Sequence, residues 1–221
     1  MGLLAKRKGT IYALVRAESE HKLDALRKHL GLKADRLVAV RGDLTKPNLG
    51  VRKDVLGKLE GKVKHFFHVA AHYDMMSEDA ELQIRVNVEG TREAINLAEC
   101  IKAKCFHYMS SVAVAGLFQG YWQEDMFEEA EEFEQPYFKS KHLAEGVVRA
   151  ECKLPYRIYR PGIVVGNSKT GAISKADGPY YLFKFLQRVR NALPAWVPLI
   201  GIEGGRLCRQ LRHRPGRPQR A

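Results

Sequence analysis

The sequence predicts an α/β fold in which helices cover both faces of a doubly wound, parallel sheet. Short apolar runs rich in β-branched residues alternate with longer amphipathic segments, the order typical of β-α-β units. Ligands bind beyond the carboxyl ends of the strands in such sheets. Residues able to contact a ligand directly follow five of the predicted strands: Arg16, Asp43, Ala70–Ala71, Ser110–Ser111 and Pro161–Gly162. The sequence therefore predicts one binding crevice at that edge of the sheet.

The expected strands are short and rich in β-branched or aromatic residues, which pack well on a pleated surface. They run from Thr10 to Arg16, Arg36 to Val40, Val63 to Val69, Cys105 to Met109 and Tyr156 to Tyr159. The last of them ends at Arg160-Pro161-Gly162, where proline and glycine interrupt the apolar run.

The expected helices show apolar residues three or four positions apart. In the first of them, Leu23, Leu26 and Leu30 share one face, and Gly31 ends the helix. Pro136 is tolerated in the first turn of another helix. The helices are expected at Glu18 to Leu30, Val51 to Leu59, Ala80 to Ile101, Tyr137 to Ala150 and Gly178 to Asn191.

The basic charge of the chain is concentrated at one end. Residues 206–221 carry six arginines and no acid, and removing those arginines lowers the formal charge from +12 to +6. The remaining value is ordinary for a domain of this length, so we expect no nucleic-acid binding. We expect the tail to be a solvated, disordered end. The alternative is that it binds phosphate backbones or an acidic partner.

No targeting or membrane signal is expected from the sequence. The longest apolar stretch is broken by Pro194 and Pro198, whereas a bilayer span needs about 18 apolar residues. The first residues lack the apolar region of a secretion signal. The four cysteines form no Cys-x-x-Cys pair, which fits reduced thiols. We therefore expect a cytoplasmic protein without a membrane span.

Three residues suggest a catalytic site. Tyr137 and Lys141 share one face of their predicted helix, and Ser111 follows a buried strand. A cation beside the phenol favours the phenolate, and a serine hydroxyl can hold a substrate oxygen. This trio favours carbonyl reduction or alcohol oxidation with a nicotinamide cofactor. Tyr180 and Lys184 repeat the spacing but have no serine partner, so we expect the first pair to be functional.

We expect no metal site. His65, His68 and His72 are close in sequence, but His65 and His68 point to opposite faces of a strand. No acid or cysteine is expected to complete a ligand set with them.

Six ordered motifs resemble the extended short-chain dehydrogenase/reductase family, which implies a Rossmann-like fold. They are Gly-Asp-Leu-Thr (42–45), His-Val-Ala-Ala (68–71), Asn-Val-Glu-Gly-Thr (87–91), Ser-Ser-Val-Ala-Val-Ala-Gly (110–116), Tyr-x-x-x-Lys (137–141) and Tyr-Arg-Pro-Gly-Ile-Val-Val-Gly (159–166). Within the family, the chain is similar to the thioester and fatty-acyl reductase branch. The match covers about residues 4 to 205, so we expect residues 1–205 to form a dinucleotide-binding domain and residues 206–221 a separate tail.

The resemblance implies a role for each catalytic residue. Tyr137 would exchange a proton with the reacting oxygen, Lys141 would bind the nicotinamide ribose and lower the pKa of Tyr137, and Ser111 would hydrogen-bond the substrate oxygen. The substrate implied is a small carbonyl compound or an acyl thioester. Residues implied to line the cofactor are Asp43, Leu44, Ala70, Ala71, Pro161, Gly162 and Ile163.

Arg16 bears on the choice of cofactor. An arginine at this strand end can pair with a 2′-phosphate, which favours NADP, with NAD as the alternative. The other interpretation of Arg16 is a solvated strand end.

The sequence departs from the family pattern at both ends. It contains no Gly-x-x-Gly-x-x-Gly turn, so the expected fold lacks its first strand and that turn. The missing strand is ordinarily central in the sheet, and its loss would leave unpaired backbone groups. The Arg/Pro/Gly-rich end resembles out-of-frame translation. We therefore hypothesise a fragment, started late and frame-shifted near residue 206; the alternative to an active oxidoreductase is a catalytically dead remnant.

Overall fold

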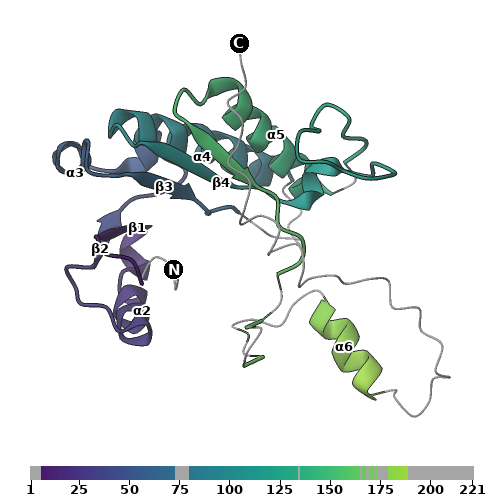
Figure 1. The fold of residues 1–221 in the computed structure, drawn as a ribbon, viewed down its shortest axis with the longest axis horizontal. Helices are drawn as coiled ribbons and strands as arrows, with labels where there is room; N and C mark the ends of the chain where they lie inside the picture. The colour runs from purple at the N-terminus through teal and green to yellow at the C-terminus, as the bar shows by residue number, and fades with distance from the viewer. Residues whose placement is uncertain are drawn as a thin grey trace. The chain divides into compact units, whose positions relative to one another are not determined.

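Five described strands, all paired in parallel, form two sheets in the computed structural model (Figure 1). β1 (Ile11–Val15) pairs with β2 (Leu37–Arg41). β3 (His65–His68), β4 (Cys105–Met109) and β5 (Tyr156–Tyr159) form the second sheet in that order. All five predicted strands are confirmed; β4 and β5 have the predicted ends, and the ends of the others differ by one or two residues.

The structure describes most of the chain. The described residues are 6–72, 80–133, 135–164, 166–167, 170–171, 173 and 179–188. The chain divides into two compact units, Met1–Arg160 and Pro161–Ala221. All the described strands belong to the first unit. The predicted boundary near residue 205 and the arginine-rich tail lie outside the described residues.

The helices connect the strands in the predicted order. They are α2 (Lys22–Leu30), α3 (Lys53–Leu59), α4 (Ala80–Cys100), α5 (Pro136–Glu151) and α6 (Pro179–Arg188). Short 3-10 turns add η1 (Ala17–Ser19), η2 (Pro47–Gly50) and η3 (Val112–Ala115). The first helix starts later than predicted, at Lys22, because residues 17–19 form the separate turn η1. Gly31 closes it as predicted, with a φ of 63° that suits glycine.

One hydrophobic core holds the first unit together. α4 and α5 pack on each other beside β4 (Figure 1). Their apolar side chains share one cluster with Phe106 and Tyr108 of β4. Both aromatic residues are almost fully buried, at 0% and 2% exposure. Val40 of β2 and Leu49 of η2 belong to the same core, so both sheets contribute to it. No described helix is long and apolar enough to cross a lipid bilayer.

The sheet is interrupted where the family's first strand is expected. Among the described residues, β1 pairs only with β2, and β3 pairs only with β4. The strands at this interruption also expose apolar side chains, among them Tyr12 and Leu14 of β1 and Phe67 of β3. Parallel strands joined by helices confirm the α/β, Rossmann-like fold without its first strand. The open edges are the unpaired backbone that the sequence analysis anticipated.

Two glycines allow close packing around the loop after β2. A Cβ at Gly90 would lie 2.5 Å from the Leu44 side chain, and a Cβ at Gly42 would lie 2.5 Å from the carbonyl oxygen of Leu49. Neither contact is sterically possible for a larger residue without a shift of its neighbour. Gly90 therefore allows Leu44 to lie against α4, and Gly42 allows the end of β2 to lie against η2.

Candidate active site

Lys141 joins α5 to the carboxyl end of β4. Its Nζ donates a hydrogen bond of 2.9 Å to the carbonyl oxygen of Met109, the last residue of that strand. Tyr137 lies one turn earlier on α5, and the Lys141 Nζ is 6.0 Å from the centre of its ring. Lys141 of the predicted i, i+4 pair thus contacts the strand end, and Tyr137 lies near the lysine.

Ser111 follows the same strand and caps the turn η3. Its Oγ accepts a 3.2 Å hydrogen bond from the amide of Ala113, and its own hydroxyl proton can still be donated. η3 packs on α5, where the His142 ring contacts the Val114 carbonyl oxygen at 3.1 Å. The structure therefore brings Ser111 to the helix that carries Tyr137 and Lys141.

Burial changes the electrostatics of the lysine. Lys141 is only 5% exposed, and loss of solvent lowers its pKa to about 8. The ammonium lies 5.5 Å from the centre of the Tyr108 ring. Burial and then the nearby Lys141 charge lower the pKa of His68 to about 3, so this histidine is neutral at pH 7. The lysine is thus the cation of a largely desolvated site.

Glu145 connects the carboxyl ends of β4 and β5 through hydrogen bonds. It is fully buried, and its carboxylate accepts hydrogen bonds of 2.6 Å from both the Ser110 hydroxyl and the Arg160 guanidinium. Arg149 adds a second ion pair to this carboxylate at 3.0 Å. Burial alone would raise the pKa of Glu145, but these hydrogen bonds hold it below its ordinary value. Glu145 therefore ties the residue before Ser111 to the residue before Pro161.

Asn87 of α4 fixes the segment after β3. Its side chain accepts from the amide of His72 at 2.6 Å and donates to the carbonyl of the same residue at 2.9 Å. It also donates to the Ser140 hydroxyl at 3.0 Å. The sequence analysis assigned no role to Asn87 or Glu145. The signal available was a polar residue on the inward face of a predicted helix, one turn from Thr91 or Lys141.

The cofactor residues assigned to the first sheet lie at its carboxyl edge. Arg16 follows β1, is largely exposed and pairs with Glu18 at 3.1 Å. Asp43 follows β2 and accepts two hydrogen bonds from Thr45, at 2.9 and 2.8 Å. Those bonds, and then the charges of Lys46 and Arg16, lower the pKa of Asp43. The charge effect places Arg16 and Asp43 in the same neighbourhood.

The other assigned cofactor residues fall into two groups. Ala70 and Ala71 are exposed just after β3, next to the segment that Asn87 fixes. Pro161, Gly162 and Ile163 begin the second unit, and Ile163 is 65% exposed there. The first group belongs to the same unit as Ser111, Tyr137 and Lys141, whereas the second group belongs to the other unit.

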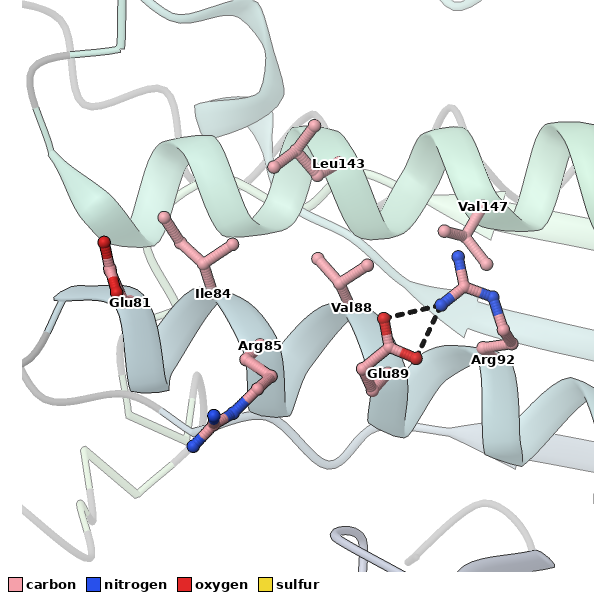
Figure 2. Close-up of a pocket in the computed structure, with 8 residues that line it drawn as sticks. All are labelled: Glu81, Ile84, Arg85, Val88, Glu89, Arg92, Leu143 and Val147. Carbon is pink, nitrogen blue, oxygen red and sulfur yellow. Dashed lines mark hydrogen bonds and ion pairs between the residues drawn. The ribbon is translucent and has the colours of Figure 1, made fainter. Parts of the chain in front are cut away.

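Figure 2 shows a groove between α4 and α5. Ile84, Val88, Leu143 and Val147 line it, and Glu89 and Arg92 pair at its rim at 2.6 Å. None of Ser111, Tyr137 and Lys141 lines it. The groove is therefore not the candidate active site.

Comparison with known proteins identifies the family. A model of a family described as "Male sterility protein", an NAD-binding family, matches residues 2–199. A linear gramicidin synthase of Brevibacillus parabrevis is 34% identical over 190 residues, 79% of this chain and 4% of that protein. The L-2-aminoadipate reductase of Candida glabrata is 29% identical in its large subunit and covers 80% of this chain, which spans 14% of it.

Solved structures agree with this family. The terminal R domain of the myxalamid PKS-NRPS pathway superposes with a TM-score of 0.72 at 31% identity, covering 85% of this chain and 52% of that one. The reductase domain of a nonribosomal peptide synthetase from Mycobacterium tuberculosis gives 0.61 at 27% identity, covering 76% and 45%. The chain thus spans about half of these domains and a small part of the curated relatives. It belongs to the male sterility protein family of NAD-binding domains, within the extended short-chain dehydrogenase/reductases.

Proposed function

We propose that the chain carries the catalytic half of an NAD(P)-dependent oxidoreductase that reduces a carbonyl or acyl-thioester group. The observation that carries the proposal is the hydrogen bond from Lys141 to Met109. It holds the lysine of α5 at the carboxyl end of β4, where Ser111 follows. The reductase names of relatives such as the Candida glabrata protein support the reaction class. That the substrate is an acyl thioester is also proposed.

Each residue of the trio has a distinct task. Tyr137 donates its phenolic proton to the oxygen that becomes an alkoxide, and Lys141 stabilises the phenolate left behind. Ser111 donates a hydrogen bond to the same substrate oxygen and orients it. Burial of Lys141 excludes water from one side of the site, which strengthens these interactions. A bound nicotinamide supplies the hydride.

The residues present fit the nicotinamide end of the cofactor but not its pyrophosphate. The buried ammonium of Lys141 suits the hydroxyls of a ribose, and the small side chains of Ala70 and Ala71 leave room beside the strand end. The sequence holds no Gly-x-x-Gly-x-x-Gly turn to cradle the pyrophosphate. We therefore expect weak binding that depends on the nicotinamide end. Arg16 favours NADPH over NADH, although its pairing with Glu18 competes with a phosphate.

A fluorescence titration of the purified chain with NADPH and NADH tests the proposal. We expect saturable binding, weakened at least about tenfold by Lys141→Met, because a hydrogen bond from a charged group contributes about 1.5–3 kcal/mol. Tyr137→Phe should bind the cofactor normally and lose the reduction of a model aldehyde.

Lys184→Met is the matched control. Lys184 belongs to the second Tyr-x-x-x-Lys pair, on α6, and is exposed there. Its replacement should leave binding unchanged. Equal weakening by both substitutions, or no weakening by Lys141→Met, would contradict the assignment of Lys141.

A second candidate is a folded but inactive remnant, favoured by the missing glycine turn. A chain that unfolds cooperatively yet shows no saturable binding of either nucleotide would support this candidate over the first.

A further inference from the structure

We propose that His65, Cys105 and His107 form a binding site for a divalent transition-metal cation such as Zn²⁺. The three side chains come from the neighbouring strands β3 and β4. The proposal is independent of the nicotinamide chemistry and uses none of its residues.

Strand register brings the three residues together. His65 is paired directly with Cys105, and His107 follows two positions later on the same face of β4. Phe106 and Tyr108 alternate with them and point into the core with α4 and α5. The candidate site thus lies on the sheet face opposite those helices. The sequence analysis considered histidines of one segment only, so it missed a cysteine and a histidine on the adjacent strand.

The donor atoms are already close. The His65 Nδ1 and the His107 Nε2 are 2.9 Å apart, and all three donor atoms lie within 4.8 Å of one another. Tetrahedral Zn²⁺, with bonds of about 2.0–2.1 Å to nitrogen and about 2.3 Å to sulfur, needs donor separations of about 3.3–3.6 Å. Small side-chain rotations therefore suffice, and a water molecule can supply the fourth ligand.

The tautomer and the restricted rotation of the His107 ring suit metal binding. Its Nδ1 contacts the Tyr159 hydroxyl at 2.9 Å, which suits the tautomer whose Nε2 lone pair faces His65. Phe67 stacks on the ring with centres 4.3 Å apart and restricts its rotation. Burial, with the neighbouring His65 and Arg157, lowers the pKa of His107 to about 4, so the ring is neutral at pH 7.

Three effects oppose metal binding. Burial raises the pKa of the Cys105 thiol, which must release its proton to solvent when the metal–sulfur bond forms. Arg157, close enough to lower the pKa of His107, also repels a cation. Binding further replaces the hydrogen bond between the two histidines. A set of two imidazoles and one thiolate favours Zn²⁺ or Co²⁺, whereas Mg²⁺ and Ca²⁺ prefer oxygen.

Titration of the purified full chain with Co²⁺ tests the proposal. We expect a thiolate-to-cobalt charge-transfer band that saturates at one equivalent and is removed by added Zn²⁺. His65→Ala and Cys105→Ser should each abolish it. His65 is exposed, so its replacement should leave the fold intact. Circular dichroism would check this for both variants.

Cys100→Ser is the matched control, because Cys100 is a free, exposed thiol on α4. The band should persist in this variant. Absence of the band in the folded wild-type chain, or its persistence in Cys105→Ser, would overturn the proposal and leave a simple hydrogen-bonded histidine pair. Either result leaves the nucleotide titration unaffected, so the two proposals fail separately.

Discussion

The β3–β4–β5 sheet and the β1–β2 sheet differ in how well their strands are buried. β4 has a strand on each side and three consecutive buried residues, Phe106, His107 and Tyr108. β1 has no fully buried residue and exposes Tyr12 and Leu14. Ser111 and Lys141, two of the predicted catalytic residues, lie at the carboxyl end of β4. This chain, which spans about half of the reductase domains that it matches, thus has a buried strand at the candidate site.

The two sheets also differ in the burial of the polar groups around them. The larger, β3–β4–β5 sheet is supported by buried polar residues such as Glu145, His68 and Asn87. The ion pairs around β1 and β2, Arg16–Glu18 and Arg41–Glu20, are exposed. Buried pairs are costly to break, whereas exposed pairs contribute little. This contrast predicts that substitutions of the buried polar residues will lower the free energy of unfolding more than substitutions of the exposed ion pairs.

Replacement of Glu145 should have the largest effect on the free energy of unfolding. Glu145→Ala leaves Arg160 buried without its anion, and we expect a loss of about 3–5 kcal/mol in the free energy of unfolding, measured with urea. Glu20→Ala, which breaks the exposed pair with Arg41, should cost less than about 1 kcal/mol. Equal losses would show that the two sheets do not differ in this way.

The second prediction is that acid lowers the stability of the β3–β4–β5 sheet. His68 and His107 lie on its strands, and their pKa values are lowered to about 3 and about 4, from an ordinary value of 6.5. Between pH 6.5 and those values the unfolded chain binds more protons than the folded chain. Stability should therefore be complete above pH 6.5 and fall as pH decreases, by up to about 1.4 kcal/mol per pH unit for each histidine.

The control for the acid effect is His68→Gln, which removes one titrating group. Its unfolding free energy should fall less steeply between pH 6.5 and 5 than that of the wild-type chain. Identical slopes for the two proteins would mean that His68 is not buried as a neutral ring.

Local patterns predicted the elements, and the motifs predicted the trio. The five strands follow from the apolar runs, and the motif correctly indicated that Lys141 lies beside the end of a strand. The catalytic role of Lys141 stays a prediction. The start of α2 at Lys22 was missed because no side chain caps that helix to mark its beginning. Glu145, Asn87 and the His65–Cys105–His107 cluster were missed for another reason. Their partners are distant in sequence, and only strand register and helix packing bring them together.

Titration of the Lys141 side chain by NMR tests the central claim most directly, because the position of this amine defines the candidate site. The chain would be labelled with ¹³C at the lysine ε-carbons, and the signal assigned from its loss in Lys141→Arg. A lysine buried against Met109 at the end of β4 should titrate with a pKa of about 8. A pKa at the ordinary value of 10.5 would place the amine in solvent and contradict the account.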